Sequence, residues 1–340
     1  MTTQTSREIH LKRRPVGLPC DDDFELVEVD VPPLQQGELL VRNIYMSVDP
    51  YMRGRMIERE SYVSCFQLNE VLQGHCVGKV VETKNDAFRV GDYVLSLNGW
   101  RELYVSDGQG LMKVDPAVAP IQSYLGVMGI TGFTAWVGLL DYGHPKENQT
   151  VFVSAASGAV GSMVCQIAKL KGCKVVGSAG ADKKVDWLVN EAGIDAAFNY
   201  KAVANIVDEV GRLCPEGIDI YFENVGGMHL EAALEHMKNF GRLVMCGMMG
   251  KANATEPVPG PRNLDYAHRK RLTLKGFNVV DHLNRLPQFQ AEMGQWISEG
   301  HIKWKETIAE GIENAHRAFI GLFKGENFGK MIVKIGPDPD

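Results

Sequence analysis

The stretch Thr150-Val151-Phe152-Val153-Ser154-Ala155-Ala156-Ser157-Gly158-Ala159-Val160-Gly161 decides the fold. Its first five residues predict a buried strand, and the segment from Ser162 onward has the apolar spacing of an amphipathic helix. The turn between them follows the pattern A-x-x-G-x-x-G, whose small residues let backbone N–H groups at the helix start approach a pyrophosphate. We therefore expect a dinucleotide-binding turn whose contact residues are Ala155, Gly158, Ala159, Val160 and Gly161.

Small-residue turns between a strand and a helix also occur for packing reasons alone, so the flanking pattern has to decide. The segment 174–180 predicts the next strand, and further strand and helix segments alternate through 196–200, 218–239 and 241–250. This alternation predicts a parallel, doubly wound sheet. The strand and helix on either side of the turn favour the dinucleotide interpretation over packing alone.

The segments before and after this region have a different sequence pattern. From Phe24 to Val114 the chain consists of short β runs separated by Gly and Pro, which predicts an all-β, barrel-like unit. The tail contains a helix over 287–300, a strand over 304–311, a helix over 312–325 and a strand over 330–336. We expect the tail to return to the first unit, so the predicted fold class is α/β with two domains.

Composition narrows the function classes. The chain has 340 residues, 45% hydrophobic and 23% charged, with a net charge of −6, so a nucleic-acid partner has no electrostatic support. No apolar stretch reaches the roughly 20 residues needed to span a bilayer, and the first 14 residues contain no signal-like apolar region. Seven scattered cysteines without a C-x-x-C pair fit neither a disulfide framework nor a structural zinc site. We expect a cytoplasmic protein with a small-molecule partner.

The choice of dinucleotide depends on the end of the second strand. An NAD-binding acid is expected about 20 residues after the glycine turn, and that position falls near Ser178, where no carboxylate ends the strand. A 2′-phosphate would instead meet small residues, a helix start, Lys183 and Lys184. Asp182 is a counter-argument, but as an N-cap it would turn to its own helix. We therefore expect NADPH rather than NADH.

With these residues in view, the chain resembles the zinc-free medium-chain dehydrogenase/reductases. Within them it is similar to the branch of leukotriene/prostaglandin reductases, plant alkenal double-bond reductases and bacterial curcumin-reductase-like enzymes. The resemblance spans nearly the whole chain and rests on ordered motifs at 47–53 (SVDPYMR), 125–135 (LGVMGITGFTA), 153–162 (VSAASGAVGS), 198–201 (FNYK), 223–227 (ENVGG) and 326–330 (ENFGK).

The resemblance implies a GroES-like β-barrel-type catalytic domain, split over 1–125 and 300–340, and a Rossmann NADP-binding domain over 126–299, with NADPH in the cleft between them. It also implies a homodimer, with which the apolar strand 241–249 is compatible. Further cofactor contacts follow by position in the motifs: Met128, Thr131, Lys184, Tyr200, Asn224, Cys246, Gly247, Phe277, Val279 and Asn327. Three of these residues could have a structural role instead of a cofactor contact. Tyr200 could be a core tyrosine, Asn224 a turn residue and Asn327 a helix cap.

Three positions decide whether the chain can bind a catalytic zinc ion. Zinc-dependent relatives resemble this chain but have cysteines near Ser47 and Val127 and a histidine near His75, and only His75 is kept here. A catalytic zinc needs three protein ligands. We therefore expect no metal. His75 either lines the cleft or is a hydrogen-bonded core histidine, and these two readings stay open.

Without a metal, the reaction that the resemblance implies is reduction of a C=C bond conjugated to a carbonyl. Hydroxyl donors can stabilise the enolate oxygen, and Tyr51, Tyr266 and Tyr62 are the candidates for this role. Family members place a tyrosine where this chain has Arg269. Tyr266 lies on the same helix face one turn earlier, so a catalytic and a core-packing role for Tyr266 are equally open.

Two alternatives to an enone or enal reductase remain. A quinone oxidoreductase of the same superfamily would share the fold and the cofactor, but the segments 49–52 and 198–200 favour the reductase branch. A non-catalytic NADPH-binding protein is favoured only by the missing family tyrosine at Arg269. A zinc alcohol dehydrogenase is the weakest reading, and the physiological substrate is not set by the sequence.

Overall fold

A computed structural model describes residues 4–337. These residues divide into two compact units, one made of 4–125, 306–327 and 331–337, and the other made of 126–305 and 328–330. The predicted tail boundary is residue 300; in the structure, residues 306–327 group with the first unit and residues 328–330 with the second. Within residues 4–337, no helix is both long and apolar enough to span a bilayer.

The first unit is built on antiparallel strands. β1 (Thr5–Leu11) pairs with β2 (Phe24–Asp30). A seven-stranded sheet has the order β14-β15-β3-β4-β5-β7, and β6 pairs with β3. The bounds of its strands are β3 Leu39–Ser47, β4 Cys76–Thr83, β5 Tyr93–Ser96, β6 Leu103–Ser106, β7 Met112–Val114, β14 Glu306–Glu310 and β15 Lys330–Lys334. β3 is buried along nearly its whole length because strands flank it on both edges.

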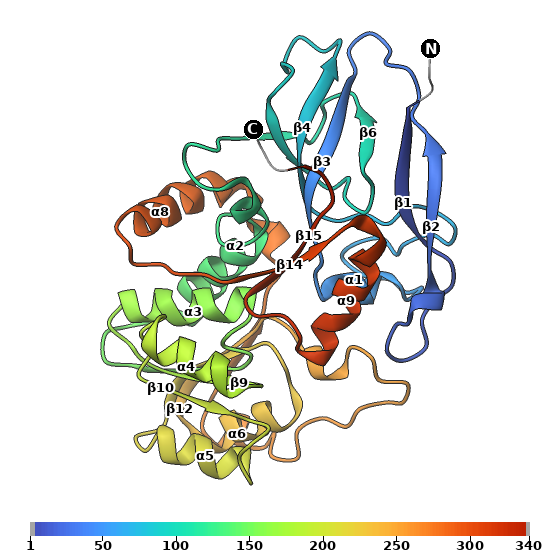
Figure 1. Ribbon diagram of the computed structural model, residues 1–340. Coiled ribbons are helices and arrows are strands. Elements are labelled where there is room, and N and C mark those ends of the chain that lie inside the picture. The colour runs from blue at the N-terminus through green and yellow to red at the C-terminus, as the bar shows by residue number, and fades with distance from the viewer. Residues whose placement is uncertain (1–3, 338–340) are drawn as a thin grey trace. The chain divides into compact units, whose positions relative to one another are not determined.

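Two helices belong to this unit, α1 (Tyr51–Arg55) and α9 (Ala315–Lys324). Their apolar side chains join those of β1 in one core around Ile9, Trp100 and Phe319. This packing explains why the C-terminal tail returns to the first unit: the apolar face of α9 is covered by residues from the start of the chain (Figure 1).

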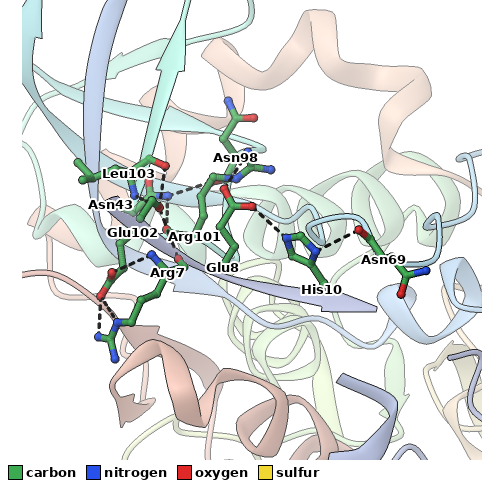
Figure 2. A network of polar contacts seen from close by, with 10 residues as sticks. Arg7, Glu8, His10, Asn43, Asn69, Asn98, Arg101, Glu102 and Leu103 are labelled. Carbon is green, nitrogen blue, oxygen red and sulfur yellow. Dashed lines mark hydrogen bonds and ion pairs between the residues drawn. The ribbon is translucent and has the colours of Figure 1, made fainter. Parts of the chain in front are cut away.

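A polar network ties β1 to the segment before β6, as Figure 2 shows. Glu8 accepts a bond from His10 at 3.1 Å and lies 3.7 Å from Arg101, while Arg7 donates to Glu102 at 3.0 Å. Asn43 donates to the carbonyl oxygens of residues 98 and 101. Burial lowers the pKa of Arg101. These contacts join residues of the same unit, so we interpret the network as structural, although Asn43 Oδ1 and Arg101 Nε are buried without a hydrogen-bond partner among residues 4–337.

The second unit is a six-stranded parallel sheet of order β10-β9-β8-β11-β12-β13. Its strands are β8 Thr150–Val153, β9 Lys174–Ala179, β10 Ala196–Asn199, β11 Ile218–Glu223, β12 Met237–Met245 and β13 Thr273–Gly276. Its helices are α2 Ile130–Val137, α3 Ala159–Leu170, α4 Asp182–Asn190, α5 Ile206–Leu213, α6 Gly227–His236, α7 Tyr266–Arg269 and α8 Leu286–Ser298.

Helices cover both faces of this sheet. α3 and α4 lie along one face, and α5 and α6 lie along the other (Figure 1). Phe152, Tyr221 and Leu234 belong to the core between the sheet and α5 and α6. The predicted α/β fold class, with a β unit and a doubly wound parallel sheet, is confirmed.

The apolar strand that is compatible with a dimer by its sequence does not lie at a sheet edge. The stretch 241–249 largely forms β12, and β12 lies between β11 and β13. The two edge strands are β10 and β13, and all four residues of β13 are exposed. The interior position of β12 accounts for its apolar sequence, because an interior strand of a parallel sheet is buried on both faces.

Candidate functional site

The turn after β8 has the shape that its small residues predicted. Ala155 adopts a left-handed conformation with φ of 48°, and Ala156 N–H donates to the Ser178 carbonyl at 2.8 Å. Gly158 is the N-cap of α3, and no side chain of residues 4–337 caps that helix start. The first-turn N–H groups of α3 are therefore oriented for an anion, as a pyrophosphate requires.

Gly161 is required by packing. A Cβ on Gly161 would overlap the Ala155 carbonyl oxygen, whereas one on Gly158 would lie 3.2 Å from the same atom. The segment 328–330 lies against this turn, because Gly329 N–H donates to the Ser157 carbonyl at 3.1 Å. Asn327, a predicted cofactor contact, directly precedes this segment.

Three lysines gather at the carboxyl ends of β9 and β10. Lys184 on α4 is 7% exposed, and burial, followed by the charges of Lys183 and Lys201, lowers its pKa. Tyr200 follows β10 and stands 3.2 Å from where a Cβ on Gly180 would lie, so a larger residue at 180 would press on the tyrosine. Mutually repelling cations beside a tyrosine hydroxyl fit the 2′-phosphate of NADPH.

Asp182 does not oppose this assignment, although its geometry differs from the prediction. The N-cap of α4 is Ala181, and Asp182 lies in the first turn. Asn199 Nδ2 donates to the Asp182 carboxylate at 2.8 Å. The Asp182 carboxylate therefore has a hydrogen-bond partner at the end of β10. The sequence pattern alone did not predict this partner.

The ends of β8 and β11 are joined by a buried carboxylate. Glu223 Oε1 accepts bonds from the N–H groups of Val225 and Gly226, at 2.6 and 2.8 Å, and from Ser154 Oγ at 3.1 Å. Burial raises the pKa of Glu223, and these bonds lower it. Asn224 Nδ2 donates to the Ser154 carbonyl at 2.7 Å.

The neighbouring strand end is held by the same residue. Cys246 and Gly247 both donate their N–H groups to the Glu223 carbonyl at 3.0 Å. Asn224, Cys246 and Gly247 are therefore brought together, as a shared cofactor site requires. Sequence reasoning missed Ser154 and Glu223 as the residues that position them. The available signal was a polar residue ending each of two apolar strands.

A cavity of about 400 Å³ borders Tyr200, the residue directly before Lys201 of the lysine cluster. It lies between the segment 225–231 and the loop 248–261, and Tyr200 lines it. His229, which is 4% exposed, packs edge-on against Tyr200 with ring centroids 5.1 Å apart. Burial lowers the pKa of His229 to about 4, so this imidazole is neutral at pH 7. The cavity is apolar enough to take a flat ring.

The remaining predicted cofactor residues lie around α2 and β13. Met128 is buried, and its carbonyl accepts a bond from Gln290 at 3.2 Å. Thr131 Oγ1 donates to the Gly126 carbonyl at 3.0 Å, which fixes its rotamer. Phe277 and Val279 follow β13, and the Phe277 ring stacks on Tyr142 at 5.1 Å.

Two of the three candidate catalytic tyrosines are neighbours in the first unit. Tyr51 begins α1, and Tyr62 lies in the loop after it with 66% of its surface exposed. Burial and the charges of Asp49 and Tyr62 raise the pKa of Tyr51, whereas Arg55 lowers it. Tyr51 therefore keeps its proton at pH 7.

Tyr266 belongs to the second unit and its hydroxyl is already engaged. It donates to Glu235 Oε1 on α6 at 2.9 Å, and Arg269 and Lys270 lie over its ring. Its ring also packs against the core beneath α6. This arrangement supports the packing alternative. Arg269 forms an exposed ion pair with Asp265 at 3.4 Å.

In this chain, the positions at which zinc-dependent relatives have metal ligands make other contacts. Ser47 Oγ donates to the Asp49 carboxylate, and the Ser47 N–H donates to the His75 carbonyl at 2.8 Å. Within residues 4–337, no three His, Cys, Asp or Glu side chains are grouped as a metal site. Asp49 and Ser47 thus form a hydrogen-bonded pair beside Tyr51.

Comparisons with known proteins bear on the whole chain. Two family models match, described as the N-terminal domain of oxidoreductase over residues 7–114 and as zinc-binding dehydrogenase over residues 159–299. The NADPH-dependent curcumin reductase of Escherichia coli is 42% identical over 98% of both chains. Prostaglandin reductase 1 of Bos taurus is 45% identical over 95% of this chain and 97% of its own.

A solved structure matches equally well. The crystal structure of CurA in complex with NADPH from Vibrio vulnificus is 42% identical, with a TM-score of 0.92 over 97% of this chain and 99% of that one. Because the match covers nearly the whole chain, both units are similar to that structure in sequence as well as in fold.

Proposed function

The chain belongs to the zinc-independent medium-chain dehydrogenase/reductase family, in the branch of curcumin, prostaglandin and alkenal reductases, and we propose that it uses NADPH to reduce the C=C bond of α,β-unsaturated ketones and aldehydes. The substrate class rests on the named relatives. The observation that carries the coenzyme assignment is the lysine cluster of Lys183, Lys184 and Lys201.

The residues at the carboxyl ends of β8 to β12 would hold the coenzyme. Backbone N–H groups at the start of α3 bind its pyrophosphate. Lys184 and Tyr200 bind the 2′-phosphate, and the cavity beside Tyr200 takes the adenine ring. The proposed contact set is Met128, Thr131, Ala155, Gly158, Ala159, Val160, Gly161, Lys184, Tyr200, Asn224, Cys246, Gly247, Phe277, Val279 and Asn327.

Bound NADPH supplies a hydride to the β-carbon of the enone. The protein's task is then to stabilise the negative charge that develops on the carbonyl oxygen as the enolate forms. Tyr51 is suited to this task because it is neutral at pH 7 and can donate its O–H. Tyr62 lies close enough to influence the pKa of Tyr51, and we propose it as a further residue of the substrate site. The α-carbon takes its proton from solvent.

We assign Tyr266 a packing role rather than a catalytic one. Its hydroxyl bond to Glu235 holds α7 against α6. In this proposal the family tyrosine missing at Arg269 is not replaced by Tyr266, and Tyr51 carries the donor role.

The assembly we propose is a homodimer in the cytoplasm. β13 is an open sheet edge with exposed residues, and such edges pair readily across a two-fold axis. All seven cysteines are free thiols, as is usual in a reducing compartment.

Consumption of NADPH tests the function directly. The protein is mixed with NADPH and, separately, with a 2-alkenal, an enone, curcumin and a simple quinone, with NADH in parallel, and products are identified by mass. We expect saturated ketone or aldehyde from the enals and enones. Turnover of the quinone alone would assign the chain to quinone reduction, and NADPH binding without any turnover would make it a non-catalytic binding protein.

A further inference from the structure

The end of β13 lies on the side of the parallel sheet that the nicotinamide half of the coenzyme would occupy. The lysine cluster marks the ends of β9 and β10 for the 2′-phosphate, and the start of α3 after β8 is oriented for the pyrophosphate. The strand order β10-β9-β8-β11-β12-β13 leaves the ends of β11, β12 and β13 for the nicotinamide. Gly276 pairs with Met245 in parallel register. Phe277 therefore begins at the same sheet edge as Cys246.

The ring of Phe277 is fixed by three neighbours. It stacks on Tyr142 with ring centroids 5.1 Å apart and ring planes at 26°. It meets Phe222 of β11 edge-on, with ring centroids 6.5 Å apart. A Cβ on Gly138 would lie 2.6 Å from its Cζ, so the ring fills the space that a side chain at this position would need. Gly138 and Tyr142 both belong to one π-helical turn, Gly138–Gly143, which directly follows α2.

Tyr142 is itself held by residues of β13 and of the segment that follows it. Its hydroxyl and His282 Nε2 share a hydrogen bond of 3.0 Å, and the two rings stand at 90° to each other. Lys275 Nζ lies 4.6 Å from the centre of the Tyr142 ring. Next to Tyr142, Asp141 forms an ion pair with Arg285. The π-helical turn and the segment after β13 are therefore joined by a ring stack, a hydrogen bond and an ion pair.

The hydrogen bond gives this cluster a property that packing alone lacks. Apolar contacts depend little on direction, whereas the bond to His282 fixes the position of the Tyr142 hydroxyl and with it the tilt of the ring. Because Phe277 stacks on that ring, the constraint passes to Phe277 and to the backbone after it. π-Helical turns are rare in proteins and occur frequently at functional sites.

We propose that Tyr142 is a positioning residue, fixed by His282, that holds Phe277 and the backbone after it where they seat the nicotinamide ring. The inference rests on the proposed function, because Phe277 and Val279 are proposed coenzyme contacts. It adds two residues that touch neither coenzyme nor substrate. A small displacement of the nicotinamide slows hydride transfer, because the reacting atoms have to lie about 3–3.5 Å apart. The 2′-phosphate end of the coenzyme is not affected.

The competing explanation is that the cluster only holds β13 on the sheet. In that case, loss of the cluster would loosen the fold and weaken the binding of every ligand of this unit alike. Tyr142→Phe removes the hydroxyl and keeps the ring stack, whereas Tyr142→Leu removes both. Tyr124→Phe is the matched control, because the Tyr124 hydroxyl donates a bond of similar length, 3.1 Å, to the Asp115 carbonyl in the first unit.

Binding of two ligands separates the two ends of the coenzyme. NADPH contains the nicotinamide, whereas adenosine 2′,5′-bisphosphate contains only the adenine end with the 2′-phosphate. We expect the Kd for NADPH to rise about tenfold in Tyr142→Leu and about threefold in Tyr142→Phe, and the Kd for the bisphosphate to stay within about twofold of wild type in both. Tyr124→Phe should change neither Kd. Equal losses for the two ligands, or no loss for either, would overturn the proposal.

Kinetics with an enone adds a second readout. We expect Tyr142→Phe and His282→Leu each to lower kcat about three- to tenfold with little change in the KM for the enone. The double variant should lose no more than either single variant, because both remove the same hydrogen bond. Additive losses would overturn the proposal. If Tyr142→Leu loses affinity for NADPH alone but the wild type reduces no enone, only the proposed function is contradicted.

Discussion

Asn199 Nδ2 donates a hydrogen bond to the Asp182 carboxylate at 2.8 Å, so the one acid near the second strand end is held by the end of β10. An acid at this strand end normally favours NADH, because it accepts from the ribose 2′-hydroxyl. Here that acid is engaged, and Lys183, Lys184 and Lys201 surround the position instead. The local balance of charge therefore favours a 2′-phosphate.

Removing one of these lysines should weaken NADPH binding selectively. We expect Lys184→Ala to raise the Kd for NADPH by about 10- to 100-fold, because a charge-assisted bond to phosphate is lost. The Kd for NADH should change less than threefold. Lys146→Ala, at an exposed position, is the control. The measurement is fluorescence titration with each coenzyme, and parallel losses for both would contradict the assignment.

Gly161 should not tolerate a side chain. Its Cβ would overlap the Ala155 carbonyl oxygen, so Gly161→Ala has to displace the turn or α3, at a cost of about 1–3 kcal/mol in unfolding free energy. Gly294→Ala in α8 is the control, because the nearest atom to its Cβ is 3.9 Å away and alanine is the better helix former. Urea denaturation measures both, and coenzyme titration should show a loss only for Gly161→Ala.

The turn and the strand order could be predicted because local sequence determines them. The apolar run 150–153, the small residues 155–161 and the amphipathic α3 form one continuous signal. Ser154 and Glu223 could not be predicted as a pair, because their bond joins β8 to β11 across 69 residues of sequence. Long-range polar partners leave no periodic trace in a single sequence.

The tyrosines show the same limit. Helical spacing made Tyr266 and Arg269 equivalent in register, but spacing does not show that Glu235 on another helix takes the Tyr266 hydroxyl. Likewise, the hydrophobic content of 241–249 did not distinguish an interior strand from an edge. In both cases the missing information is which neighbour the fold supplies.

Tyr51 and Tyr266 should respond differently to loss of the hydroxyl. We expect Tyr51→Phe to lower kcat for an enone by about 10²-fold or more, because the proposed enolate donor is lost. Tyr266→Phe should keep kcat within about threefold, since its hydroxyl bonds to Glu235. Steady-state kinetics with NADPH binding measured in parallel decides this. A large loss of kcat in Tyr266→Phe would restore its catalytic assignment.

The open edge of β13 predicts the assembly. A dimer that pairs two copies of β13 brings Leu274, which is 40% exposed, near its own copy. We expect Leu274→Asp to shift the mass in light scattering from that of two 37.6 kDa chains toward that of one, because like charges then meet at the interface. Leu283→Asp, exposed on a different segment, is the control. A monomeric wild type would refute the homodimer.

His229 should make the protein sensitive to mild acid. Its pKa is lowered from 6.5 to about 4 by burial, so between these values the unfolded chain binds a proton that the folded chain does not. Stability is therefore lost as pH falls through this window, by roughly 2 kcal/mol at pH 5 at about 1.4 kcal/mol for each pH unit below 6.5.

The comparison that isolates His229 uses His229→Phe, which keeps a ring against Tyr200 and cannot be protonated. Urea denaturation at pH 7 and pH 5 should show a smaller drop in unfolding free energy for this variant than for wild type. His316, whose pKa burial also lowers, contributes equally to both proteins and cancels in the difference. If the unfolding free energy of the two proteins dropped equally, the imidazole would be solvated in the folded state. The cavity beside Tyr200 would then not be apolar.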